Sequence, residues 1–354
     1  MDIALQRLRN QRLLGEAFAS PVDVVKWLGA VQSQDYHGAK WGVAQRTKGA
    51  LDSDLDRLYN EGAILRTHVL RPTWHFVTPE DIVWMLELTA PRVHAASAYY
   101  YRKTELDPPL LSRCGDLIGK ALAGDQYLTR NELAARLRQE GIEAEGLRMG
   151  YIVGYLELEA LICSGPMRGK QFTYALLEER APHARRLDRD EALAELTRRY
   201  FTSHGPAMVQ DFGNWSGLTI ADGKAGIDAN REHLTEANLD GKSYWMTEMK
   251  SVQEPAKPVV HLLPNYDEHV IAYKDYTPAF DPEVYARLEP NDYRMLAHLI
   301  ARNGKIVGGW RRTIARKQVR IEASLLEDVG EVDISEATKA YSRFLGLPVE
   351  VDMR

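Results

Sequence analysis

Cysteine is almost absent from this sequence, since only Cys114 and Cys163 occur among its 354 residues. Two isolated cysteines exclude a disulfide framework and a cysteine-based zinc site. Long apolar runs are lacking too: no stretch reaches about 18 uncharged apolar residues, and the first fifteen residues have no apolar core of an export signal. We therefore expect a soluble, cytoplasmic protein without membrane contact.

Motifs for nucleotide, hydrolase or metal chemistry are also missing. The sequence contains no P-loop, dinucleotide-binding fingerprint, serine-hydrolase elbow or zinc-ligand spacing, so we expect neither a cofactor nor a metal. What is present is an ordinary globular composition, 45% hydrophobic and 27% charged, with a length typical of about two or three domains. The formal net charge of −5, taken alone, argues against a nucleic-acid partner.

The pattern of residues 1–105 predicts a winged helix-turn-helix. Ser20 followed by Pro21 is typical of a helix start, and the apolar spacing that follows predicts a helix ending near Gly38. A short segment at 39–45, a helix at 52–60 and a hairpin formed by 64–69 and 73–77 come next.

The remaining chain repeats this order and then changes character. A capping box at Thr129–Glu132, a helix at 147–159 and a hairpin with a basic tip predict a second winged helix over 106–185. A third is expected over 186–252. Residues 253–354 contain strand candidates at 259–263, 295–302, 305–311 and 318–324 and a closing helix at 335–345. The predicted fold class is therefore α+β, with tandem winged helix-turn-helix units before a small β-rich domain.

The segment Gln32-Ser33-Gln34 is the strongest candidate for chemistry. Two glutamines one residue apart project from one face of an extended chain, but about 200° apart on a helix. Acting together therefore requires that the helix end before them. Their uncharged amides could hold one water molecule or bind a base edge. The alternative is a polar helix terminus in solvent.

Basic residues gather in two places. The first hairpin carries Arg66, His68, Arg71 and His75 around its proline turn, and such a wing can contact DNA phosphates or simply be a packed sheet. The second place is the stretch from Gly304 to Arg320, which has no acidic residue. Its basic side chains suit a DNA backbone or a solvated strand, and they are Lys305, Arg311, Arg312, Arg316, Lys317 and Arg320.

Four segments together resemble the AlkZ-like winged-helix DNA glycosylases, a family that includes the YcaQ-like branch. They are 29–35, 67–75, 263–268 and 308–312. The resemblance implies tandem winged helices and a C-terminal β-barrel that grip double-stranded DNA, excision of N7-alkylated purines, and unhooking of interstrand crosslinks. It also implies that the family's Gln-x-Gln motif falls on Gln32 and Gln34. The middle residue is Ser33 here, whereas the AlkZ branch has an apolar residue.

The chemistry implied by this resemblance needs no ionised catalyst. Alkylation at N7 makes the purine a cationic leaving group, so the protein has mainly to place a water molecule at C1′ of the sugar. Asp35 could add negative potential or act as a base, or it could only end a helix, and His37 is a further supporting candidate. No lysine is placed for an imine with the sugar, which predicts a monofunctional, metal-independent enzyme. An open site that works without full base flipping is also implied.

Two other classes of function stay open at this point. A winged-helix protein can bind DNA without catalysis, as a regulator does, and it can serve as a scaffold for other proteins. The Gln pair favours the enzyme, acting as a monomer on alkylated or crosslinked duplex DNA and associated with a bacterial nucleoid. The segment Tyr266-Asp267-Glu268 suits metal binding, acid–base chemistry or a salt-bridged loop.

Overall fold

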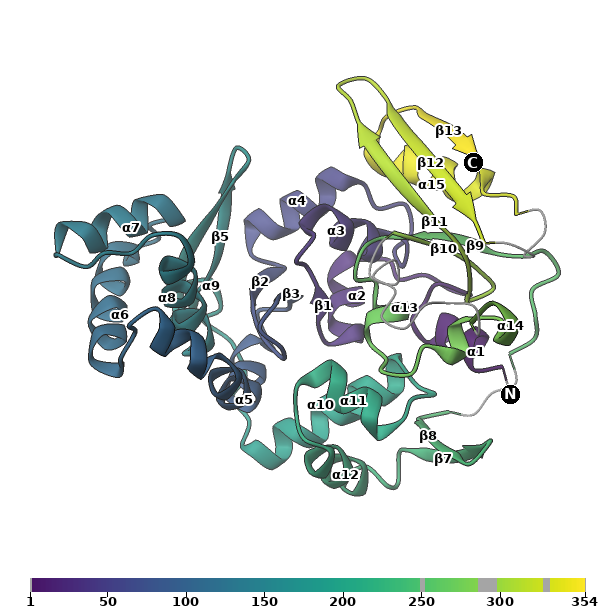
Figure 1. Ribbon diagram of the computed structural model, residues 1–354, viewed down its shortest axis with the longest axis horizontal. Helices are drawn as coiled ribbons and strands as arrows, with labels where there is room; N and C mark the ends of the chain where they lie inside the picture. Colours follow the sequence, from purple (N-terminus) through teal and green to yellow (C-terminus); the bar gives the residue numbers. More distant parts are fainter. Residues whose placement is uncertain (1, 249–251, 286–297, 327–331, 354) are drawn as a thin grey trace.

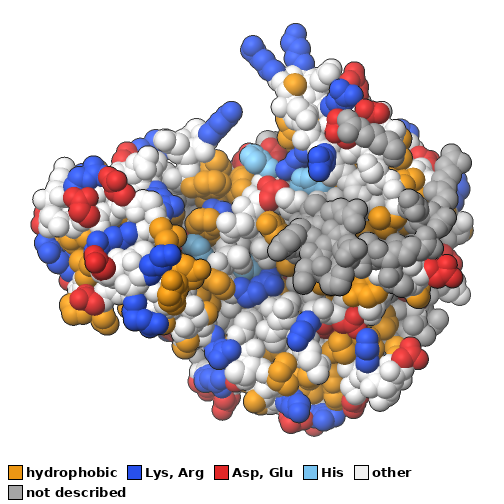
Figure 2. All heavy atoms as spheres, in the orientation of Figure 1, with side chains coloured by type: hydrophobic (Ala, Val, Ile, Leu, Met, Phe, Trp, Pro, Cys, Tyr) orange, Lys and Arg blue, Asp and Glu red, His pale blue; other side chains and the backbone are white. Residues whose placement is uncertain are grey.

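The structure is a computed structural model that describes residues 2–248, 252–285, 298–326 and 332–353. Helices and strands are mixed along the chain and form a lobe and a larger body, with an opening between them (Figure 1). The space-filling view shows this opening as a hollow between the lobe and the body (Figure 2). None of the described helices is both long and apolar enough to cross a membrane.

The first part of the chain builds the floor of the opening. The helices are α1 (Ile3–Asn10), α2 (Pro21–Leu28), α3 (Tyr36–Ala44) and α4 (Asp52–Glu61), and the strands are β1 (Val31–Gln32), β2 (Leu65–His68) and β3 (Trp74–Val77). The strands form an antiparallel sheet in the order β1-β3-β2. The predicted start of α2 and the β2–β3 hairpin are therefore confirmed.

The predicted end of α2 is wrong. Gly29 follows Leu28 with a φ of +82°, a left-handed conformation that glycine adopts without strain and that stops the helix. Residues 36–44 then form a separate helix, where the sequence predicted none. The segment between the two helices is consequently extended.

The lobe has its own apolar core. It contains α6 (Pro108–Leu122), α7 (Arg130–Gln139), α8 (Gly146–Leu158), α9 (Leu177–Arg180) and the sheet of β4 (Leu128–Thr129), β5 (Ile162–Arg168) and β6 (Gln171–Leu176). The capping box at Thr129 is confirmed, since the Thr129 hydroxyl and the Glu132 carboxylate each accept from the other residue's backbone N–H. The long helix α5 (Ile82–Lys103) joins the lobe to the body.

A second set of helices packs below the opening. It comprises α10 (Arg189–Ser203), α11 (Val209–Ser216) and α12 (Ile220–Ala229), followed by the hairpin β7 (Thr235–Leu239) and β8 (Lys242–Met246). Then come β9 (Val260–Leu263), α13 (Glu268–Ile271), a 3-10 turn (Thr277–Ala279), α14 (Pro282–Tyr285), β10 (Leu299–Arg302), β11 (Lys305–Ile314), β12 (Val319–Leu325), α15 (Ser335–Leu345) and β13 (Val349–Met353). The first residues of the strand predicted at 295–302 lie outside the described residues.

The C-terminal sheet is open, which corrects the expected β-barrel. Its order is β13-β12-β11-β10-β9, and among the described strands the edge strands β9 and β13 do not pair with each other. Instead of closing, the sheet packs on α15 and on Trp41 of α3, whose indole N–H donates to the Leu262 carbonyl at 2.6 Å. Residues far apart in the chain therefore share one core, although the proposed division at 252–253 stays a prediction.

Candidate active site

The backbone of the Gln32-Ser33-Gln34 segment is extended at Gln32 and Ser33 and bends at Gln34. Val31 and Gln32 pair with Phe76 and His75 of β3, and the Ser33 N–H continues the ladder by donating to the Trp74 carbonyl at 2.7 Å. Asp35 then caps α3 by accepting from the Gly38 N–H at 3.0 Å. The motif therefore lies between two helix ends.

The two glutamines have different surroundings. Gln32 is buried, and its side-chain carbonyl accepts from Nη2 of Arg71 at 2.8 Å. Because a guanidinium only donates, this contact fixes which end of the amide is the oxygen and leaves the amino group as a donor. Gln34 is exposed, and no residue in the described ranges hydrogen-bonds to its side chain. One amide is therefore held in place while the other faces solvent.

Arg66 supports this segment from behind. Its Nε and Nη2 both donate to the Ser33 carbonyl at 3.2 Å, and its guanidinium lies over the rings of Trp74 and Phe172 at 4.3 and 4.7 Å. Burial lowers the pKa of Arg66. This buried side chain therefore holds the motif in place, and its predicted contact with DNA stays a prediction.

His75 is fully buried, and its predicted contact with DNA stays a prediction. Its Nδ1–H donates to the Thr73 carbonyl at 2.9 Å, and burial together with the charge of Arg71 lowers the pKa of His75 to about 3. His68 is partly buried, contacts the Glu157 carboxylate and packs against Trp74. The first hairpin thus presents no row of basic side chains and instead carries Arg71 against Gln32.

The two supporting candidates lie at the start of α3. Asp35 is the cap of that helix, and its Oδ2 is 3.7 Å from Nη2 of Arg312. His37 is exposed, with its ring 5.6 Å from the ring of Tyr36. Asp35 therefore begins a helix, whereas the alternative placed it at a helix end, and it also connects the motif to the C-terminal sheet.

The basic stretch forms the β11–β12 hairpin, which rises beside the opening (Figures 1 and 2). Arg311, Arg316 and Lys317 are exposed there. Arg312 is half-buried and donates to the Tyr341 hydroxyl at 2.8 Å, while Lys305, at the other end of β11, donates to the Phe280 carbonyl at 3.2 Å. The β5–β6 hairpin, with exposed Arg168 and Lys170 at its tip, stands on the opposite side.

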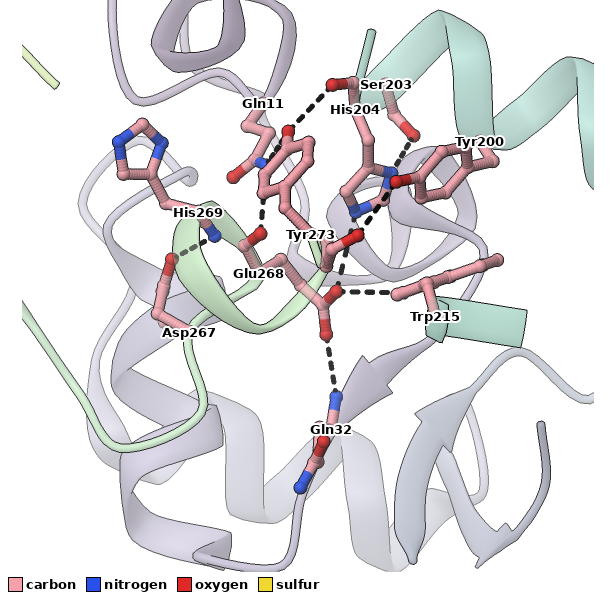
Figure 3. Close-up of polar contacts among 12 residues, drawn as sticks. Gln11, Gln32, Tyr200, Ser203, His204, Trp215, Asp267, Glu268, His269 and Tyr273 are labelled. Atoms are coloured by element: carbon pink, nitrogen blue, oxygen red, sulfur yellow. Dashed lines mark hydrogen bonds and ion pairs between the residues drawn. The ribbon is translucent and has the colours of Figure 1, made fainter. Parts of the chain in front are cut away.

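A buried carboxylate, that of Glu268, lies against the Gln32 backbone (Figure 3). The sequence singled out its segment, Tyr266-Asp267-Glu268, but not this contact. Oε1 of Glu268 accepts from the Gln32 backbone N–H and Oε2 accepts from the Trp215 indole N–H, both at 3.0 Å. Nε2 of His204 is 3.4 Å from Oε2. Burial raises the pKa of Glu268, but His204 and the Gln32 N–H lower it by more, and the net pKa lies below its usual value.

The neighbouring residue, Asp267, anchors the same loop. Its two carboxylate oxygens accept from Nη1 and Nη2 of Arg46 at 2.9 and 2.8 Å, and both side chains are buried. Arg46 follows the end of α3, so this pair joins the N-terminal helices to the loop that carries Glu268. In the parts of the chain that the structure describes, no group of three acidic, histidine or cysteine side chains could hold a metal ion.

The chain is similar to known proteins over nearly all of its length. The family model for DNA glycosylase AlkZ-like proteins matches residues 25–346. A curated relative from Streptomyces sahachiroi, named interstrand DNA cross-link repair glycosylase, is 24% identical over an alignment of 323 residues. The match covers 86% of this chain and 85% of the relative. The solved structure of Streptomyces sahachiroi DNA glycosylase AlkZ superposes with a TM-score of 0.78 at 20% identity and covers 99% of this chain and 98% of that one.

Proposed function

Because the chain belongs to the AlkZ-like DNA glycosylase family, we propose that it hydrolyses the N-glycosidic bond of N7-alkylated purines in duplex DNA and that it unhooks interstrand crosslinks. The observation that carries this proposal is the Gln32-Ser33-Gln34 segment between α2 and α3, in which Arg71 fixes the Gln32 amide and Gln34 is exposed. The curated relative is named for crosslink repair, which supports the second half of the proposal.

The reaction needs a correctly placed water molecule more than an acid. N7-alkylation gives the purine a positive charge, so the base leaves as a neutral molecule when the C1′–N9 bond breaks. The Gln32 amino group donates a hydrogen bond to the water oxygen, and the Gln34 carbonyl accepts a hydrogen bond from the water. The water oxygen forms the new bond to C1′, and the proton that it loses passes to solvent. Preorganised neutral dipoles of this kind lower the barrier without disturbing the cationic sugar.

The proposed enzyme is monofunctional and metal-independent. An imine with the sugar would require a neutral lysine amine at the site. Lys40, which follows the motif on α3, is buried with its Nζ 2.8 Å from carboxylate oxygens of both Asp52 and Asp56. Two carboxylate partners keep the Lys40 ammonium charged and indicate a structural role for it. We therefore expect the product to be an abasic site without strand cleavage.

The protein is proposed to act as a monomer and to bind duplex DNA across the opening. Its winged-helix units are proposed to hold the DNA. The exposed Arg311, Arg316 and Lys317 of the β11–β12 hairpin are the proposed phosphate contacts, with Arg168 and Lys170 on the other side. Charge concentrated on two hairpins gives a local positive potential even though the whole chain carries −5.

Removing two of these charges should change the salt dependence of DNA binding. For Arg316→Ala/Lys317→Ala we expect the slope of log K against log salt concentration to become shallower by about 1.8, because each lost phosphate contact removes about 0.9. Fluorescence anisotropy with an undamaged duplex at several salt concentrations measures this slope. The control is Lys224→Ala, an exposed lysine on α12, and equal slopes in all three proteins would remove the hairpin from the interface.

The proposed reaction is tested with a duplex that contains a single N7-methylguanine. Excess protein should convert it to an abasic site that breaks only after alkali, and a second duplex with an N7-linked crosslink should lose its link. A protein that retards both duplexes in a gel but leaves every strand alkali-stable would be a regulator. Strand breaks before alkali treatment would contradict the monofunctional mechanism.

A further inference from the structure

The carboxylate of Glu268 is one of the most deeply buried charged groups in the described chain, with 1% of the residue exposed. Burying a carboxylate is unfavourable unless its oxygens find partners. Here both oxygens are occupied: Oε1 by the Gln32 backbone N–H and Oε2 by the Trp215 indole N–H. The position of this charge is therefore determined by the fold, 236 residues away in sequence from the motif that it contacts.

The surrounding groups leave Glu268 little freedom. Trp215 lies in the last turn of α11 and His204 follows α10. The His204 ring stacks on Tyr200 with centroids 4.9 Å apart. The backbone carbonyl of Glu268 accepts from Nε2 of Gln11 at 3.1 Å. Figure 3 shows His204 and Trp215 approaching the carboxylate from separate elements, while its other oxygen accepts from the Gln32 backbone N–H. The Glu268 side chain is therefore preorganised as an acceptor for one particular backbone N–H.

Gln32 is consequently gripped at both ends. Glu268 holds its backbone N–H at 3.0 Å, and Arg71 holds its side-chain carbonyl at 2.8 Å. Burial lowers the pKa of Arg71, and the negative charge of Glu268 opposes that lowering, so the two ions that hold Gln32 also stabilise each other. A shift of Gln32 along the strand would break both contacts.

We propose that Glu268 is a positioning residue for base excision, which acts through Gln32 by fixing the backbone from which the water-orienting amide projects. This inference rests on the proposed glycosylase activity. In this proposal Glu268 acts without contacting the substrate. Its charged carboxylate makes a stronger hydrogen bond to the Gln32 backbone N–H than a neutral oxygen acceptor would. Small displacements of a group that orients a reactant lower the reaction rate strongly.

A second buried carboxylate, that of Asp81, provides a control that distinguishes a positioning role of Glu268 from a role in folding. Asp81 is also fully buried and also accepts from an indole N–H, that of Trp84 at 3.0 Å, but its other partners are Arg199 and Thr78. None of its contacts is with the Gln-x-Gln segment. Asp81→Asn should therefore lower stability and leave the excision rate of the folded protein unchanged.

The test is single-turnover excision of N7-methylguanine with saturating protein, together with DNA affinity and urea unfolding. For Glu268→Gln we expect the maximal rate to fall about tenfold to a hundredfold, as for loss of a charged hydrogen bond, with DNA affinity unchanged within about twofold. Glu268→Asp keeps the charge but is one methylene shorter, so it should lose rate similarly. Wild-type rates in both folded variants would overturn the inference.

A double-mutant cycle shows whether the effect passes through Gln32. In a Gln32→Ala background, Glu268→Gln should cost little further rate, because the side chain that it positions is gone. If Gln32→Ala falls to the rate of spontaneous base loss, Gln32→Asn supplies the background. An undiminished effect of Glu268→Gln there would mean that the carboxylate does not act through Gln32. Absence of excision by the wild type would instead refute the proposed function itself.

Discussion

Alanine at both Gln32 and Gln34 should lower the single-turnover rate of N7-methylguanine release by about a thousandfold, the magnitude typical of removing preorganised hydrogen-bonding groups. The reason is that the Gln32 amide is already fixed by Arg71 before substrate arrives, whereas water without the two amides has no preferred position. The rate is measured with saturating protein so that binding does not contribute.

The control for this experiment is Gln139→Ala. Gln139 is the last residue of α7, exposed and on the lobe rather than in the Gln-x-Gln segment, so its loss should change neither rate nor affinity. DNA binding by the double variant should stay close to that of the wild type, because neither amide is charged. If the double variant excises the base at the wild-type rate, the hydrolytic water is held elsewhere.

Replacing Asp267 with asparagine should lower the free energy of unfolding by about 3–5 kcal/mol, since it leaves a buried arginine without its counter-ion. Arg46 donates to both oxygens of Asp267 and also to the carbonyls of Gln11 and Gly42, so it cannot move to water. Urea unfolding at pH 7 measures the loss. Glu16→Gln, which breaks the exposed pair with Lys48, should leave the unfolding midpoint unchanged.

The same pair predicts how stability depends on acid. Burial raises the pKa of Asp267, but the Arg46 charge and hydrogen bonds lower it by more, to a net value below the ordinary one. The stabilisation is therefore fully present above the unfolded pKa of about 3.9 and is lost as the pH falls through the lower folded value. The difference between wild type and Asp267→Asn should shrink below about pH 4. A constant difference down to pH 2 would contradict this ion pair as the cause.

Local signals in the sequence were sufficient for most of the elements. The Ser20 cap, the capping box at Thr129 and the β-branched strands around the Pro72 turn each act within a few residues, and each predicted element formed. The end of α2 was missed because Val31 continued the apolar spacing, although Gly29 carried the stop signal. The open form of the C-terminal sheet was missed because its packing against α3 and α15 involves distant parts of the chain.

Only part of the candidate site could be predicted from local signals in the sequence. The Gln-x-Gln spacing identified the segment, but Arg66 and His75 looked like DNA contacts, since an isolated sequence does not show which face of a hairpin is buried. Arg71, also assigned to DNA, contacts Gln32, a partner that the sequence did not indicate. Glu268 belongs to a segment that the sequence singled out, but its contact with Gln32 could not be found there, because only the folded chain brings the two residues together.

The central claim is that this chain cleaves a glycosidic bond, and the most direct measurement is the release of free base. A duplex with one N7-methylguanine is incubated with excess protein, and the soluble fraction is analysed by liquid chromatography and mass spectrometry. The account predicts free N7-methylguanine in a one-to-one ratio with abasic sites, and release from the Gln32→Ala/Gln34→Ala protein close to the spontaneous rate. Duplex that is bound but releases no base above the spontaneous rate, with an N7-linked crosslink left equally intact, would contradict it.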